Sequence, residues 1–167
     1  MTRAASFPGP VDKWHPYGNL DPFVLPAAAD RALDEFFLIS KQVDVFSFLL
    51  YGTCLGLYRD GGYIEGDQDL DVGSIGDVPS LVRDPLKAGF RMIALVATNV
   101  HFLKYGIILD LWFSFPSVEY FQSPDKFMYK NKSYNFPSPL EDFLASEYGD
   151  WKTKSLSRAL TRYPEET

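Results

Sequence analysis

The feature that most constrains this chain is a run of alternating acidic residues over positions 67–72, Asp-Gln-Asp-Leu-Asp-Val. In an extended strand, successive side chains point to opposite faces, so the three aspartates share one face while Leu70 and Val72 enter the core. Carboxylates two positions apart start about 6.6 Å from each other. At that separation they repel by roughly 2–3 kcal/mol at an effective dielectric of about 20. A hard divalent cation such as Mg²⁺ would offset this repulsion, whereas a solvated acidic turn is the alternative interpretation.

A further acid, Asp110, lies inside the apolar segment 107–115, which is predicted to be a strand. A lone ionised carboxylate among aliphatic and aromatic neighbours is costly unless it is paired or binds a metal. If this strand lies beside the one that carries Asp69 and Asp71, the three carboxylates converge within about 5 Å. On its own, Asp110 is explained equally well by an edge strand that faces water or by a pair with a nearby basic residue.

The rest of the pattern predicts a single α+β domain over residues 27–167, preceded by a proline-rich arm over residues 1–26. Helices are expected over 27–41, 78–88 and 140–148, with a helical turn over 54–59 and a last short helix over 155–162 in a helical C-terminal tail. Strands are expected over 45–51, 69–72, 90–97, 100–105 and 107–115, the last three as an antiparallel meander, with short extended pieces near 127–136. Gly73 should close the second strand, Ser138 should cap the helix at 140, and Gly149 should end it. The expected core is a mixed or antiparallel sheet flanked by helices.

Charge and composition exclude several classes of function. Lys and Arg total 16 against 22 Asp and Glu, a net charge of −6 at pH 7, which argues against nucleic acid or an anionic membrane as the main partner. The single cysteine, Cys54, excludes a disulfide framework, and two histidines are too few for a His-based zinc site. No apolar stretch approaches the ~18 residues of a membrane span, and no signal peptide is evident. We therefore expect a cytoplasmic protein without membrane insertion.

The aromatic residues make up 16% of the chain, an unusually high share. Such an excess fits a sugar-stacking surface or a homodimer interface. The sequence does not decide between the two.

Gly52 and Thr53 end the expected strand at 45–51 and lead into the helical turn. A strand that turns into a helix in this way presents backbone N–H groups and a hydroxyl to an anion. Arg59 follows closely and could bind the same phosphate with two N–H donors. An ion pair between Arg59 and a neighbouring acid, such as Asp60, is the alternative.

The strand at 100–105 holds two further candidates. Lys104 is a candidate phosphate ligand, with a plain surface lysine as the alternative. His101 is interpreted mainly as a packed strand residue, with a role as a base as the alternative.

A longer motif covers residues 52–71. It reads Gly-Thr-x-Leu-Gly-x-x-Arg-x-x-Gly-x-Ile and is followed by the Asp-rich run; later come Pro137, Leu144 and Tyr-Gly-Asp-Trp over 148–151. This combination resembles the nucleotidyltransferase superfamily and, within it, the LicD/fukutin family of phospho-alcohol transferases. The chain departs from the family pattern at Asp60, where His is usual, at 65–66, where Pro-Trp is usual, and at Gln68, where an acid is usual.

The resemblance implies a transferase that depends on Mg²⁺, with Mn²⁺ as the alternative. It would move a phospho-alcohol, such as phosphocholine or ribitol phosphate, from a CDP-activated donor to a hydroxyl of a sugar or glycan. Asp69 and Asp71 would bind the metal at the pyrophosphate, and Asp110 would share the metal and take the proton from the attacking hydroxyl. The phosphates would be bound by the candidates introduced above: Gly52, Thr53, Arg59 and Lys104.

Two alternatives use the same fold. One is a nucleotidyltransferase that moves a nucleoside monophosphate from a nucleoside triphosphate to a small-molecule or sugar acceptor with the same carboxylates. The other is a non-catalytic protein that binds a nucleotide or a glycan. Loss of one of the three acids would favour the non-catalytic protein, but all three are present.

Overall fold

A computed structural model describes residues 24–115 and 118–154 and confirms the α+β class. The proline-rich arm, except for its last three residues, and the expected helix at 155–162 lie outside the described residues. The helices are α1 (Pro26–Gln42), α2 (Tyr51–Leu55), α3 (Val78–Lys87) and α4 (Leu140–Tyr148), with a π-helical turn at Gly56–Asp60 and a 3-10 turn at Val118–Phe121. The strands are β1 (Phe46–Leu49), β2 (Asp69–Ile75), β3 (Arg91–Leu95), β4 (Asn99–Lys104), β5 (Ile107–Trp112), β6 (Asp125–Tyr129) and β7 (Lys132–Phe136). None of the helices in the described part has the length and apolar character needed to cross a membrane.

Five strands form the main sheet in the order β1-β2-β5-β4-β3. The expected antiparallel meander of β3, β4 and β5 is confirmed, and β1 is antiparallel to β2. Strands β2 and β5 are parallel neighbours, so the sheet is mixed. A parallel pair requires a crossover connection, and here α3, β3 and β4 provide it.

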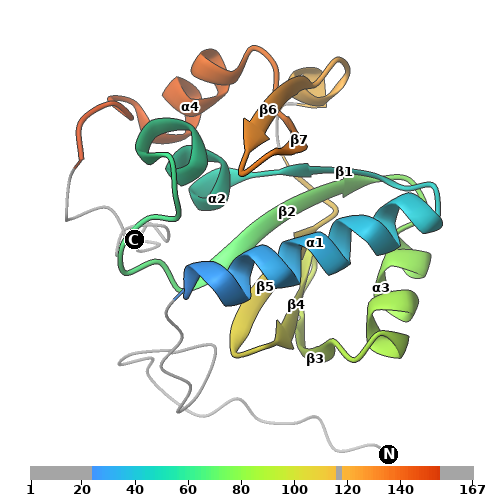
Figure 1. Ribbon diagram of the computed structural model, residues 1–167. Coiled ribbons are helices and arrows are strands. Elements are labelled where there is room, and N and C mark those ends of the chain that lie inside the picture. The colour runs from blue at the N-terminus through green and yellow to red at the C-terminus, as the bar shows by residue number, and fades with distance from the viewer. Residues whose placement is uncertain (1–23, 116–117, 155–167) are drawn as a thin grey trace, which may run out of the picture.

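Helices α1 and α3 cover one face of this sheet (Figure 1). The core under them is apolar and partly aromatic: Phe90 meets both Phe36 of α1 and Phe102 of β4 edge-to-face, with ring centroids 6.3 and 6.0 Å apart. Leu70 and Val72 are fully buried, as the alternation in the sequence predicts. Their burial places the aspartates of β2 on the opposite face.

Gly73 does not end β2, contrary to expectation, because the strand continues to Ile75. The glycine is needed for packing. The ring of Phe48 in β1 lies directly over it, and a Cβ at this position would stand 2.2 Å from Phe48 Cε2. Phe48 in turn stacks on Phe121 at 4.5 Å between ring centroids, within an aromatic cluster.

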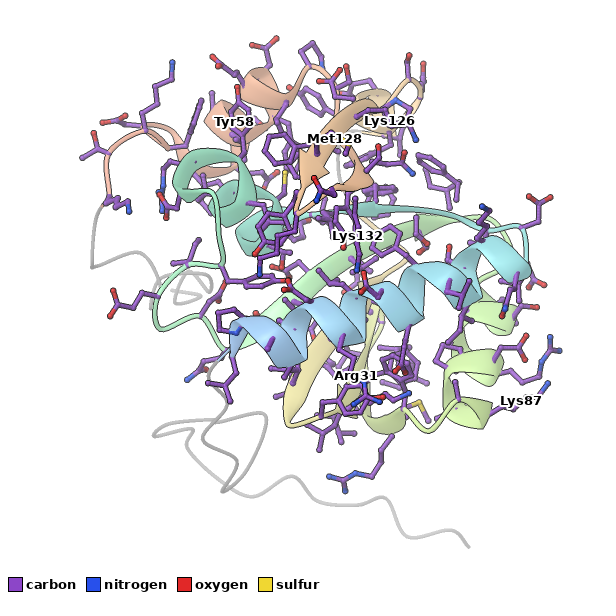
Figure 2. The ribbon with its side chains drawn as sticks, viewed as in Figure 1. Arg31, Tyr58, Lys87, Lys126, Met128 and Lys132 are labelled. Atoms are coloured by element: carbon purple, nitrogen blue, oxygen red, sulfur yellow. The ribbon has the colours of Figure 1, made fainter. Side chains whose placement is uncertain are left out.

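The extended pieces expected near 127–136 form the β6–β7 hairpin, which lies beside β1 (Figure 1). Two lysines attach it to α1. Lys130 pairs with Asp30 at 2.6 Å, and Lys132 pairs with Asp34 (Figure 2 shows Lys132 between the hairpin and α1). The side chain of Asn135 donates to the Ser47 carbonyl of β1 at 2.7 Å. These contacts hold the hairpin against the edge strand of the main sheet.

The caps of α4 differ in part from expectation. Gly149 ends the helix with φ 64°, as predicted. At the other end, Ser138 does not cap the helix; its hydroxyl donates to Asp125 of β6, and the same carboxylate accepts the Leu140 amide at 3.3 Å. The capping group therefore comes from a distant strand.

Candidate active site

The parallel pairing of β2 and β5 brings the predicted acids together. Asp71 lies directly opposite Asp110 in the register, and Asp69 lies two positions earlier on the same face of β2. One carboxylate oxygen from each of Asp69, Asp71 and Asp110 lies within 4.8 Å of the others. The sequence predicted that these three carboxylates would converge if the two strands were neighbours. The strands are neighbours, and the carboxylates do converge.

The burial of these acids determines what they can bind. Asp71 is fully buried and Asp110 is 4% exposed, while Asp69 is half-buried and gives the cluster its accessible side. Buried carboxylates this close repel each other strongly unless a cation lies between them. Three carboxylate oxygens are hard ligands of the kind that Mg²⁺ and Mn²⁺ prefer. The donor set therefore fits a divalent cation.

Asp71 is oriented by three groups of the protein. Its Oδ2 accepts the backbone N–H of Gly52 at 3.0 Å, and its Oδ1 accepts the indole N–H of Trp112 at 3.1 Å. Its own backbone N–H donates to the Thr53 hydroxyl at 2.8 Å. The Gly-Thr pair does lie at the acidic site, as expected, but in this structure both residues hold Asp71 in place.

Asp67 also reaches this region, which the sequence left undecided. A Cβ on Gly52 would stand 2.9 Å from Oδ2 of Asp67 and 3.4 Å from Oδ2 of Asp71. The absence of a side chain at Gly52 is thus what allows the Asp67 carboxylate to approach the start of α2, while a Cβ there would just touch Asp71. The shared face of Asp67, Asp69 and Asp71 in the sequence was the signal for this grouping.

His101 lies beside the cluster, whereas from the sequence it was interpreted mainly as a packed strand residue. It is the register partner of Asp110 across β4 and β5, and its Nδ1 is 2.5 Å from Asp110 Oδ1. The other ring nitrogen, Nε2, lies 3.2 Å from the amide nitrogen of Asn99. Only the cross-strand register reveals this pair.

Arg59 and Lys104 are placed differently. Arg59 donates from Nε and Nη2 to both carboxylate oxygens of Asp60, each at 2.9 Å, and from Nη1 to the Trp151 carbonyl. The Asp60 carboxylate raises the pKa of Arg59, and the guanidinium lowers the pKa of Asp60. Arg59 therefore forms the ion pair with a neighbouring acid that the sequence indicated as the alternative to phosphate binding.

The structure does not bring Lys104 to the acidic cluster. Three positions after His101 on the same strand, its side chain projects from the other face of the sheet. There its ammonium pairs with Glu35 of α1 and donates to the Ala88 carbonyl at 2.6 Å. We therefore do not assign Lys104 to this site.

No protein-family model matches the chain, and no curated protein sequence matches it. Among solved structures, the solution structure of the antibiotic-resistance factor ANT(2'')-Ia matches with a TM-score of 0.55 and 11% identity, over 78% of this chain and 79% of that one. The crystal structure of ANT(2'')-Ia in complex with adenylyl-2''-tobramycin matches with a TM-score of 0.50 and 10% identity, over 70% and 76% of the two chains.

ANT(2'')-Ia is an aminoglycoside nucleotidyltransferase. This chain has a nucleotidyltransferase-like fold. At such low identity the likeness concerns the fold alone. The expected nucleotidyltransferase-like fold is thus confirmed, whereas the comparisons give no support to the narrower LicD/fukutin resemblance. The three acids lie on adjacent strands of that nucleotidyltransferase-like fold.

Proposed function

We propose that this protein is a metal-dependent nucleotidyltransferase that moves a nucleoside monophosphate from a nucleoside triphosphate to a hydroxyl group of a small molecule. The observation that carries the proposal is the convergence of Asp69, Asp71 and Asp110 within 4.8 Å on adjacent strands of a nucleotidyltransferase-like fold. The neighbouring structure supports the acceptor class, because ANT(2'')-Ia was crystallised with an adenylylated aminoglycoside.

The reaction requires the protein to bind a metal ion, to bind the donor phosphates and to accept a proton. Asp69 and Asp71 hold the divalent cation, with Asp110 as a shared ligand. When bound, the cation supplies Lewis-acid stabilisation of the charge that develops on the phosphates. Gly52, Thr53 and, after release from Asp60, Arg59 are the proposed neighbours of the donor phosphates.

Asp110 accepts the proton of the acceptor hydroxyl as its oxygen attacks the α-phosphorus. The new bond joins that oxygen to the α-phosphorus, and the bond between the α-phosphorus and the bridging oxygen breaks. Pyrophosphate leaves with the electrons of the broken bond. The products are the nucleotidylated acceptor and pyrophosphate.

Phospho-alcohol transfer from a CDP-activated donor is the second candidate function. It is favoured by the Gly-Thr-x-Leu-Gly-x-x-Arg motif, which folds into α2 and the π-helical turn next to the acids. The same three carboxylates would serve, with CMP as the leaving group.

Donor binding separates the two functions. The protein is unfolded thermally with Mg²⁺ and each of ATP, GTP, CTP, UTP, CDP-choline, CDP-ribitol and CDP-glycerol. A donor at a hundred times its Kd stabilises by about 2.7 kcal/mol, a rise in Tm of roughly 5–10 °C for a domain of this size. We expect a Mg²⁺-dependent rise with a nucleoside triphosphate and pyrophosphate release when an aminoglycoside is added as a test acceptor. A rise with one CDP-alcohol alone would instead establish the second candidate.

A further inference from the structure

We infer that His101 is a positioning residue, which holds the carboxylate of Asp110 in one orientation toward Asp69 and Asp71. This inference deepens the proposed function and rests on it, since it concerns how the same site is kept ready. It starts from the 2.5 Å separation between His101 Nδ1 and Asp110 Oδ1, two atoms from side chains that are 12% and 5% exposed.

The direction of the hydrogen bonds follows from the residues behind His101. The Thr98 hydroxyl donates to Oδ1 of Asn99 at 3.2 Å, which turns the amide nitrogen of Asn99 toward the imidazole. That nitrogen lies 3.2 Å from Nε2 of His101 and carries only donors. Nε2 therefore accepts, and a neutral imidazole that accepts at Nε2 carries its hydrogen on Nδ1. Asn99, itself 3% exposed, thus selects the tautomer that carries its hydrogen on the nitrogen next to Asp110.

The consequence for Asp110 is a fixed carboxylate plane. With Nδ1 of the imidazole 2.5 Å from Oδ1, rotation about the last side-chain torsion would break this close pair in a buried, water-poor setting. Asp71 is held in a comparable way by the Gly52 amide and the Trp112 indole. Each buried acid therefore has a nitrogen-bearing group behind it, an arrangement that outer-shell partners of metal ligands commonly provide.

Two amide substitutions in the full-length chain test the inference, because they separate the two contacts of the imidazole. His101→Asn places an N–H donor near the position of Nδ1 and can still donate to Asp110. His101→Gln carries the same amide one bond farther out, near the position of Nε2, and can contact Asn99 only. The two variants match in polarity and charge, so a general loss of packing would affect both.

Each variant is measured in two ways. Mn²⁺ affinity is determined from the free Mn²⁺ signal in electron paramagnetic resonance, without any substrate. Then kcat and KM for nucleoside triphosphate are measured with the donor and acceptor found above. For His101→Gln we expect Mn²⁺ affinity and kcat to fall by roughly 10- to 100-fold with an unchanged nucleotide KM. For His101→Asn we expect Mn²⁺ affinity and kcat to stay within about threefold of the wild-type values, because the contact with Asp110 is kept.

The outcomes separate the inference from the proposed function. A wild-type chain that binds no Mn²⁺ contradicts the proposed function itself. A wild-type chain that binds Mn²⁺, with equal affinities and equal kcat for the Asn and Gln variants, overturns the role of His101 and leaves the function standing. If His101→Gln does not unfold cooperatively, Asn99→Leu is measured in its place. Without the Asn99 amide, nothing keeps the hydrogen of His101 on Nδ1, so Mn²⁺ affinity should fall. Wild-type affinity in this variant would refute the inference.

Discussion

Gly52 lies so close to Asp67 that a methyl group on its Cα would stand 2.9 Å from Oδ2 of that carboxylate. The same methyl group would be 3.4 Å from Oδ2 of Asp71. The glycine at the start of α2 therefore determines how closely Asp67 can approach the helix, with Asp71 just beyond it. This relationship gives the first prediction.

Gly52→Ala should push the Asp67 carboxylate away, bring a methyl group into contact with Asp71 and lower Mn²⁺ affinity by roughly tenfold or more, as displacement of supporting contacts does at metal sites. Gly62→Ala is the matched control, because a Cβ there meets nothing within 4 Å. Mn²⁺ titration of both variants checks the prediction. Equal affinities in the two variants would show that the approach to Gly52 is unimportant for metal binding.

Asp69→Asn and Asp71→Asn should both remove activity, by about 10³-fold or more, since a metal supplies several kcal/mol of transition-state stabilisation. Their stabilities should differ. Asp71 accepts from both Gly52 and Trp112, so an amide at this position leaves one buried donor without an acceptor and costs about 1–3 kcal/mol. Asp69 is half-buried and its change should leave the Tm nearly unaltered. Urea unfolding of both variants measures this difference, and equal losses of stability would contradict it.

Gly73→Ala should destabilise the protein by about 1–3 kcal/mol, the usual cost of overpacking a core. A Cβ there would stand 2.2 Å from the fully buried ring of Phe48. The double variant Gly73→Ala with Phe48→Leu should cost less than the sum of the two single changes, because the smaller side chain leaves room for the methyl group. Strict additivity of the unfolding free energies would argue against this contact.

Glu35→Gln should lower stability at pH 7 by about 0.5–1 kcal/mol, in the range for partly exposed ion pairs. The hydrogen bonds from Lys104 and then Tyr105 hold the pKa of Glu35 below the ordinary value of a glutamate, 4.5. A lowered folded-state pKa contributes stability above the unfolded pKa and loses it as pH falls through the folded value. The difference between wild type and Glu35→Gln should therefore vanish by about pH 2. A difference that is independent of pH would exclude the ionised carboxylate as its source.

Lys104→Met should leave the nucleotide KM unchanged, because the ammonium lies on the α1 side of the sheet, paired with Glu35. Its stability should fall as that of Glu35→Gln does. A large rise in nucleotide KM would restore Lys104 as the phosphate ligand that the sequence suggested.

Local sequence was enough to predict the elements of this protein and part of its site. Alternation placed Asp69 and Asp71 on one face and Leu70 in the core, and helical periodicity predicted α1. The Gly52-Thr53 pair, predicted from the sequence as a phosphate site, lies beside the acids and contacts Asp71. These features could be predicted because they depend on residues that are close in the sequence. The alternation of side chains along a strand and their spacing around a helix are both local properties.

The tertiary structure decided how these pieces meet. Only the parallel pairing of β2 with β5 puts Asp110 opposite Asp71, and only the register of β4 on β5 gives His101 to Asp110 and turns Lys104 to the far face. From the sequence, Gly73 was expected to end β2; in the structure it lies inside the strand, under the ring of Phe48. Pairing between strands is set by burial over the whole chain, since a one-residue slip would exchange the two faces. The sequence by itself therefore determined which acids point the same way, and the packed sheet determined which of them share a site.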